Sequence, residues 1–228
     1  MSLKDNLEEV LEEIEETRLH SLTGEKVNLI AVSKNHPVEK INELSQYGCL
    51  NFGENKVQEI VDKIPLSKNN IKYHMIGNLQ SNKVKYIYDK VVLIQSIDRL
   101  KLVKEINKRA KKDDIFVDIL IQVNISKEEQ KGGVNIEDTL DFLENCLDYK
   151  NVAIKGLMGI AANTKNQNEI RTSFRNLFKL KEDIINRNYE NVSMDYLSMG
   201  MSGDYKIAIE EGSNMVRIGT KIFGKREY

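Results

Sequence analysis

Short apolar runs rich in valine, isoleucine and leucine recur eight times along the chain, with helix-like segments between them. The runs cover residues 27–33, 50–53, 73–77, 91–97, 115–123, 153–160, 194–199 and 215–219. Amphipathic segments are clearest at 38–47, 100–110, 139–147 and 174–185. Such alternation predicts βαβ units and a parallel sheet. Eight units within 228 residues favour a (β/α)8 TIM-type barrel, for which about 250 residues is typical. An open doubly wound sheet is the alternative.

An extra helix precedes these units at residues 3–19. Its apolar residues form one helical stripe, and its opposite face is rich in glutamate. The stripe consists of Leu3, Leu7, Val10, Leu11 and Ile14. The chain contains only 2 prolines, so we predict no proline-rich linker and a single domain over residues 1–228.

Composition excludes several classes of function. The chain has 34 basic and 35 acidic residues, a net charge of −1, which argues against a strongly basic nucleic-acid or membrane binder. Cys49 and Cys146 are far apart and the 3 histidines lack metal-site spacing, so we expect neither a disulfide framework nor a metal centre. No run approaches the ~18 apolar residues of a membrane span, and the N-terminus lacks the apolar run of a signal peptide. We therefore expect a cytoplasmic protein.

Lys34 follows the first predicted strand, and chemistry in a barrel lies where strands end at their C-terminal face. Alternation places Ile30, Val32 and Lys34 on one face. If Ile30 and Val32 fill the barrel interior, Lys34 points into its mouth, where partial burial favours a nucleophilic amine suited to a Schiff base. A strand-end lysine that only reaches solvent is the alternative.

The last two predicted strands end in residues suited to an anion. Arg217 shares a face with Gly219, and Gly219-Thr220 offers backbone N–H groups and a hydroxyl after the final strand. The preceding strand ends in a loop rich in serine and glycine that includes Ser198 and Ser202. Barrel phosphate sites are usually formed by the loops after strands seven and eight. An ion pair for Arg217 and helix capping by Ser202 are the structural alternatives.

Two further strand ends are polar. Asn55 follows Phe52-Gly53-Glu54, and His74 begins a segment that continues into the amide-rich stretch 78–83. Helix capping and a buried, hydrogen-bonded histidine are the corresponding structural interpretations.

These segments resemble the pyridoxal phosphate homeostasis protein family, which is similar to the N-terminal barrel of alanine racemase. The matching motifs run through nearly the whole chain and are specific as an ordered set. They are Ala31-Val32-Ser33-Lys34, Phe52-Gly53-Glu54-Asn55 with Val57-Gln58-Glu59, residues 74–83, Gln122-Val123-Asn124 with Ser126, Glu128, Lys131 and Gly133, Gly156-Leu157-Met158, residues 197–202 with Asp204, Ala208 and Ile209, and Val216-Arg217-Ile218-Gly219 with Ile222-Phe223-Gly224.

The resemblance implies pyridoxal 5′-phosphate as cofactor, held as an internal aldimine by Lys34. It also implies that Arg217 lies against the pyridine nitrogen and that the phosphate is surrounded by Ser198, Ser202, Gly219 and Thr220. Asn55 and His74 are implied near the cofactor ring. The chain departs from the family pattern at Asn35-His36, where a threonine-rich turn is usual, and at Gln95, where a histidine is common.

An arginine beside the ring nitrogen disfavours its protonation and weakens the ring as an electron sink. Racemisation also needs two acid–base groups on opposite faces of the substrate. Resembling racemases draw the second, a tyrosine, from an additional β-domain of a partner subunit, and the predicted barrel leaves no room for such a domain. We therefore expect a cofactor-binding and homeostasis protein with no evident catalytic activity. It would be a monomer whose partners include apo forms of enzymes that use the cofactor.

Two alternatives stay open at this stage. An amino-acid racemase or related pyridoxal enzyme would sustain α-proton exchange. A lysine-dependent aldolase acting on a sugar phosphate would be colourless.

Overall fold

Eight parallel strands close into a barrel in the computed structural model of the chain, which describes residues 2–126, 128 and 132–224. Adjacent strands follow the order β1-β2-β3-β4-β5-β7-β8-β9, and β9 pairs with β1 to close the ring. The barrel strands are β1 (Asn28–Val32), β2 (Asn51–Glu54), β3 (Lys72–Met75), β4 (Leu93–Ile97), β5 (Val117–Asn124), β7 (Val152–Gly159), β8 (Val192–Met201) and β9 (Met215–Ile218). Each lies within two residues of its predicted position, and the predicted barrel is confirmed. A short strand that the sequence did not predict, β6 (Val134–Asn135), pairs with β5.

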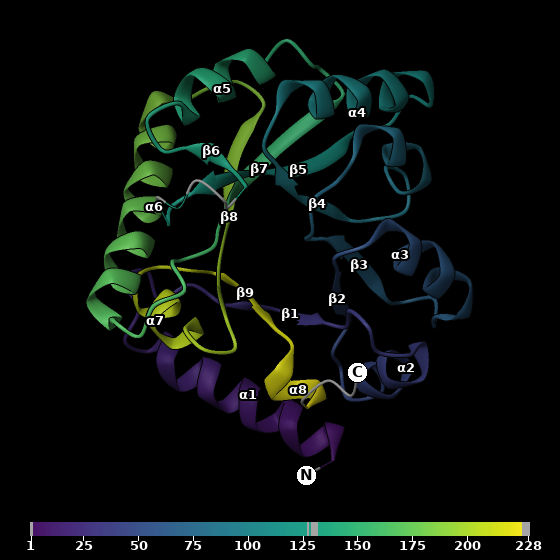
Figure 1. The fold of residues 1–228 in the computed structure, drawn as a ribbon, viewed down its shortest axis with the longest axis vertical. Coiled ribbons are helices and arrows are strands. Elements are labelled where there is room, and N and C mark those ends of the chain that lie inside the picture. The colour runs from purple at the N-terminus through teal and green to yellow at the C-terminus, as the bar shows by residue number, and fades with distance from the viewer. Residues whose placement is uncertain (1, 127, 129–131, 225–228) are drawn as a thin grey trace.

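Helices surround this inner ring of strands (Figure 1). They are α1 (Leu3–Arg18), α2 (Val38–Ser45), α3 (Val57–Lys63), α4 (Leu100–Lys112), α5 (Thr139–Cys146), α6 (Gln167–Arg187), α7 (Tyr205–Glu210) and α8 (Thr220–Phe223), with 3₁₀ turns at Ile64–Leu66 and Ser81–Tyr86. Helix α6 begins earlier than predicted. The prediction missed its first two turns because they are mostly polar and lack a clear apolar period. Asn166 caps this start by accepting a hydrogen bond from the Asn168 backbone N–H at 3.1 Å.

The apolar core has two parts, which follow from the alternation of side chains along each strand. Ala31 belongs to the larger cluster between the strands and the surrounding helices, whereas Ile30 belongs to a small cluster inside the barrel. The inner cluster consists of Ile30, Leu93, Leu120, Met158 and Met215. Interior packing therefore makes the barrel a filled core below its mouth.

Helix α1 lies across the outside of α7 and α8 (Figure 1). Leu7, Val10 and Ile14 are buried, whereas Leu11, predicted on the same stripe, is exposed. The Glu13 carboxylate accepts hydrogen bonds from Lys206 and Lys221 at 2.8 and 2.5 Å, and from the Tyr205 hydroxyl. These contacts tie α1 to the two helices that follow the last strand ends.

Two findings bear on site chemistry, and both apply to the described residues only. No helix is long and apolar enough to cross a membrane. No group of metal-ligating side chains is large enough to hold an ion. Lys131, part of the motif set, lies outside the described residues.

Candidate functional site

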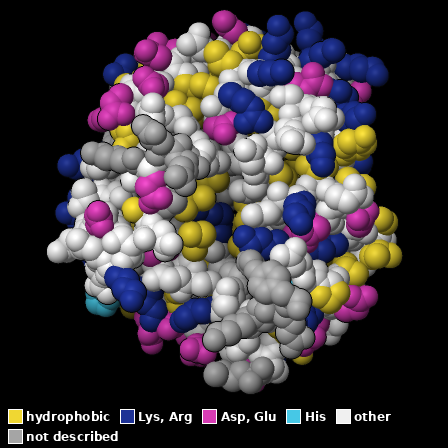
Figure 2. Space-filling view, in the orientation of Figure 1, with side chains coloured by type: hydrophobic (Ala, Val, Ile, Leu, Met, Phe, Trp, Pro, Cys, Tyr) yellow, Lys and Arg dark blue, Asp and Glu magenta, His cyan; other side chains and the backbone are white. Residues whose placement is uncertain are grey.

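A cavity of about 280 Å³ opens at the mouth of the barrel, where the strands reach their C-terminal ends. The space-filling view shows the molecule hollowed here, with basic and apolar side chains inside (Figure 2). Its lining residues come chiefly from the ends of β1, β2, β8 and β9 and from the loops after them. They are Val32, Lys34, Asn55, Ile76, Ile160, Met201, Ser202, Gly203, Arg217, Gly219 and Thr220.

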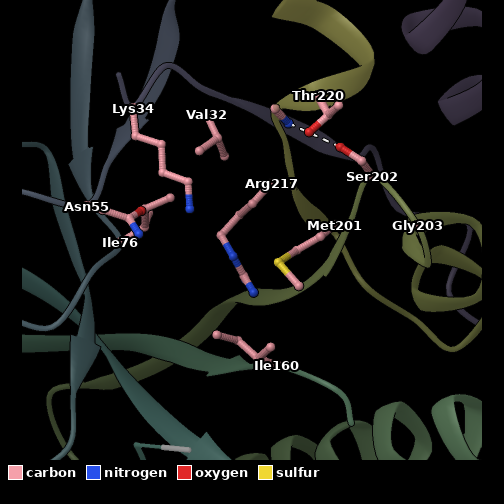
Figure 3. A pocket seen from close by; sticks show the side chains of 11 residues that line it. Val32, Lys34, Asn55, Ile76, Ile160, Met201, Ser202, Gly203, Arg217 and Thr220 are labelled. Carbon is pink, nitrogen blue, oxygen red and sulfur yellow. Dashed lines mark hydrogen bonds between the residues drawn. The ribbon is translucent and has the colours of Figure 1, made fainter. Parts of the chain in front are cut away.

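Lys34 enters the cavity from a turn directly after β1. Ile30 is buried inside the barrel and Val32 lines the cavity, so the predicted alternation along this strand is confirmed. Lys34 is half-buried, and its side chain points into the same space as Arg217 (Figure 3). The strand thus delivers one amine to the barrel mouth, with apolar neighbours below it.

Arg217, on β9, supplies a second cation at the bottom of the same space. The residue is only 4% exposed. Its Nη1 donates to Ser198 Oγ at 2.6 Å and its Nη2 to the Gly159 carbonyl at 2.9 Å. Burial lowers its pKa to about 10, so the guanidinium stays charged at neutral pH. Its hydrogen-bond partners among the described residues are both neutral, and the Asp204 carboxylate acts on it through charge alone, partly opposing the effect of burial.

A chain of neutral hydrogen-bonding groups runs from Arg217 into the barrel. Ser198 Oγ donates to Gln95 Oε1 at 2.7 Å, and Gln95 Nε2 lies 3.3 Å from His74 Nδ1. His74 Nε2 lies 3.2 Å from Asn51 Oδ1. Burial, with a smaller effect of Lys72, lowers the pKa of His74 to about 4. The imidazole is therefore neutral, with Nδ1 accepting from Gln95 and Nε2–H donating to Asn51.

The loops after β8 and β9 form the wall opposite Lys34. The Gly219 N–H donates to Ser202 Oγ at 3.3 Å, and the Met201 N–H donates to Asp204 Oδ1 at 2.6 Å. The register between β8 and β9 shifts before Met201, which lies opposite Arg217. Gly200 makes this shift possible: its φ is +96°, and a Cβ there would lie 2.6 Å from Ala208 Cβ.

Six of the eight predicted site residues line the cavity, and two do not. Lys34, Asn55, Ser202, Arg217, Gly219 and Thr220 lie together at the barrel mouth. Ser198 and His74 are buried beneath Arg217 in the hydrogen-bonded chain and are not part of the cavity wall. The amide-rich stretch 78–83 is also absent from the cavity wall.

Sequence reasoning missed the apolar part of the lining, formed by Val32, Ile76, Ile160 and Met201. Their positions at or just beyond predicted strand ends were the available signal, but only polar residues there were taken as site candidates. With these walls, the cavity presents two cations, an amide and two hydroxyls within partly apolar surroundings. None of the described lining residues is acidic. The arrangement suits a planar ligand that carries an anionic group and a carbonyl able to react with an amine.

Comparison with known proteins gives consistent results along the whole chain. The sequence model of the family described as "Alanine racemase, N-terminal domain" matches residues 6–227. The protein named "Pyridoxal phosphate homeostasis protein" from Aquifex aeolicus is 44% identical over 230 residues, covering 100% of both chains. The protein of the same name from Haemophilus influenzae is 37% identical, covering 100% of this chain and 98% of its own.

A solved structure shows the same architecture. PipY of Synechococcus elongatus, described as having PLP bound, superimposes with a TM-score of 0.85 at 28% identity. The match covers 98% of this chain and 100% of PipY. Identity at these levels over complete relatives establishes that the chain belongs to the pyridoxal phosphate homeostasis protein family.

Proposed function

We propose that the chain binds pyridoxal 5′-phosphate in the barrel-mouth cavity and serves in the intracellular homeostasis of this cofactor. The observation that carries the proposal is that Lys34 and the buried Arg217 enter one cavity. The loop residues Ser202, Gly219 and Thr220 line the opposite wall. The names of the relatives and the PipY complex support the identity of the ligand.

The residues present fit this ligand. The cavity volume of about 280 Å³ is near the lower end of the ~300–1,000 Å³ typical of small-molecule sites. A Cβ added at Gly203 would meet no atom within 4 Å, so this wall leaves open space. Arg217 is a buried cation with only neutral hydrogen-bond partners, and an anionic ligand supplies the opposite charge.

Each of the eight predicted site residues has a part in the proposed binding. The unprotonated Nζ of Lys34 adds to the aldehyde carbon, the amine loses both N–H protons, and the aldehyde oxygen leaves as water, giving the covalent aldimine. Arg217 lies at the ring nitrogen and Asn55 beside the ring. Ser202, Gly219 and Thr220 surround the phosphate. Ser198 and His74 act on the ligand through Arg217, which they hold from beneath.

The composition of the cavity favours binding over catalysis. Besides the Arg217 guanidinium, which stays charged, Lys34 is the single titratable side chain among the described lining residues, whereas racemisation requires two acid–base groups. Arg217 also disfavours protonation of the ring nitrogen. The proposal therefore assigns storage or delivery of the cofactor, with apo forms of enzymes that use it as recipients.

The proposal also includes a monomer in the cytoplasm. Cys49 and Cys146 are both buried free thiols whose pKa burial raises to about 12. Thiols kept in this form are the usual state of cysteine in a reducing compartment.

Reduction with borohydride tests the covalent site. The purified protein should be yellow, and the reduced adduct should map to the peptide containing Lys34. Lys34→Ala should abolish the aldimine band while leaving unfolding unchanged, and Lys221→Ala, which removes a lysine paired with Glu13, should keep the band. An adduct on another lysine, or a colourless protein that takes up no cofactor, would refute the assignment.

A transfer assay tests the physiological role. An apo-enzyme that requires the cofactor should regain activity faster with the loaded protein than the spontaneous release rate allows. Activation at the release rate alone would reduce the role to storage. Sustained exchange of amino-acid α-protons in deuterated water would instead show a racemase-type enzyme.

A further inference from the structure

A group of three charged side chains, two of them buried, lies beneath the turn that carries Lys34. We call Glu54, Glu59 and Lys63 the acid–lysine cluster. Glu54 ends β2 and is 0% exposed, while Glu59 and Lys63 lie one helical turn apart on α3. Lys63 Nζ donates to Glu54 Oε1 at 2.7 Å and to Glu59 Oε2 at 3.0 Å. None of the three lines the cavity.

The remaining hydrogen bonds of this cluster go to the two neighbours of Lys34. Ser33 Oγ donates to Glu54 Oε1 at 2.7 Å, and Lys63 Nζ donates to the Ser33 carbonyl at 3.0 Å. On the other side of Lys34, the Asn35 N–H donates to Glu59 Oε2 at 2.8 Å. The cluster therefore holds the backbone immediately before and immediately after the reactive lysine.

The turn itself is in a conformation that needs such support. Asn35 has a φ of +63°, in the left-handed region that non-glycine residues occupy infrequently. Such a residue carries backbone strain and persists where its surroundings fix it. Its N–H bond to Glu59 and the His36 N–H bond to the Ser33 carbonyl at 3.0 Å close the turn.

Stability alone does not account for the cluster. Lys63 is 8% exposed, so two opposite charges are withdrawn from water, and a buried ion pair often adds less stability than apolar side chains of the same volume. Glu54 Oε2 is buried without a hydrogen-bond partner among the described residues, which adds a further cost. What the cluster supplies specifically is a fixed geometry for Ser33 and Asn35.

We propose that Glu54, Glu59 and Lys63 are positioning residues that fix the turn around Lys34, so that its amine meets the aldehyde of the bound ligand. This inference rests on the proposed function. The three side chains do not touch the ligand; they act on the imine-forming step through Ser33 and Asn35. Loss of the cluster should weaken the covalent bond to the ligand while leaving the phosphate and ring contacts in place.

Two ligands separate positioning from general stability. Pyridoxal 5′-phosphate can condense with Lys34, whereas 4′-deoxypyridoxine 5′-phosphate has a methyl group in place of the aldehyde and cannot. Lys63→Met keeps an unbranched side chain and removes the donor. We expect this variant to bind the aldehyde ligand about tenfold more weakly and to form the aldimine band about tenfold more slowly. Tenfold corresponds to the loss of one hydrogen bond to a charged group. Binding of the deoxy ligand should stay within about twofold.

A second pair of variants acts at the surface side of the cluster and avoids a failure to fold. The Glu59 side chain is 20% exposed. Glu59→Ala removes the acceptor of the Asn35 N–H and should show the same selective loss, whereas Glu59→Gln retains an acceptor oxygen and should restore binding of the aldehyde ligand. Glu211→Gln is the matched control, because Glu211 is a 1% exposed carboxylate paired with Arg171 and Arg175.

The outcomes distinguish this inference from the proposed function. If the unmodified protein forms no aldimine band, the proposed function fails. If it forms the band but Lys63→Met and Glu59→Ala keep the ratio of the two affinities, the positioning role is refuted. Equal weakening of both ligands, or the same change in Glu211→Gln, would also refute it, because those results indicate general destabilisation.

Discussion

His74 is a buried neutral histidine, and we expect His74→Gln to remove the loss of stability that titration of this imidazole causes between pH 7 and pH 5. The pKa of His74 is about 4 in the folded chain, against an ordinary value of 6.5. Between these values the unfolded chain binds the proton and the folded chain does not. The contribution of His74 is therefore complete above pH 6.5 and is lost as the pH falls toward 4.

The magnitude follows from the two pKa values. With 6.5 for the unfolded and about 4 for the folded chain, His74 lowers the free energy of unfolding by about 2 kcal/mol between pH 7 and pH 5. Glu54 acts in the opposite direction. Burial, opposed by Lys63 and Ser33, raises its pKa from 4.5 to about 6, so its contribution is present below pH 4.5 and is lost as the pH rises through 6. From pH 7 to pH 5 it adds about 1 kcal/mol.

Urea unfolding at pH 7 and pH 5 measures both effects. The protein is first stripped of bound aldehyde with hydroxylamine, because a ligand that binds only the folded chain shifts the midpoint. Glutamine at position 74 can accept from Gln95 and donate to Asn51, so the hydrogen-bonded chain is retained. The difference in unfolding free energy between His74→Gln and the unmodified protein should shift by about 2 kcal/mol in favour of the variant on going to pH 5.

Glu54→Gln should shift by about 1 kcal/mol in the other direction. Parallel pH dependences for the unmodified protein and His74→Gln would refute the reasoning, because they would mean that the imidazole titrates alike in the folded and unfolded chains.

Three further perturbations test separate parts of the molecule. Gly156→Ala should cost about 3 kcal/mol or more in urea unfolding, because a Cβ there would lie 1.8 Å from the Tyr196 carbonyl oxygen at a φ of +148°; a loss below 1 kcal/mol would contradict this. Glu13→Gln should cost about 1 kcal/mol at pH 7 and flatten the loss of stability below pH 4.5. Burial raises the pKa of Glu13, but hydrogen bonds from Lys206, Lys221 and Tyr205 together outweigh it and lower the pKa to about 2; a variant that unfolds along the same acid curve would refute this. In the loaded protein, Arg217→Met should raise the pKa of the ring nitrogen by about one unit or more, measured by ¹⁵N NMR of labelled cofactor, and an unchanged titration would place the arginine elsewhere.

The barrel could be predicted from sequence because its pattern is local. Each strand is a short apolar run, and each run needs only its own residues to be recognised. The sequence failed to predict helical turns and strands that consist mainly of polar residues or are very short. The first two turns of α6, from Gln167 to Ser173, carry few apolar residues. Strand β6 has only two residues, Val134 and Asn135, which are too few for an apolar period to be recognised.

The sequence could predict which strand ends carry the site. It could not predict how far each side chain lies from the barrel mouth. Alternation indicates the face on which a residue lies, not its height along the barrel axis. Ser198 and Ser202 were therefore equivalent in the sequence. The structure places Ser198 beneath Arg217, while Gly200 and the register shift bring the following residues to the cavity. Partners such as Gln95 and Lys63 join positions far apart in the chain, and no local spacing indicates them.

The neutral hydrogen-bonded groups beneath Arg217 explain why its positive charge is not neutralised inside the barrel and acts toward the cavity. Every group from Ser198 to Asn51 is uncharged, and the low pKa of His74 keeps it so at neutral pH. A charged imidazole there would repel Arg217, and a carboxylate in place of Gln95 would neutralise it at low local dielectric. With neither present, the field of Arg217 acts on the cavity, where it favours an anionic ligand and disfavours a protonated ring nitrogen beside it. The same hydrogen-bonded groups that fix the guanidinium therefore leave its positive charge available to the cavity.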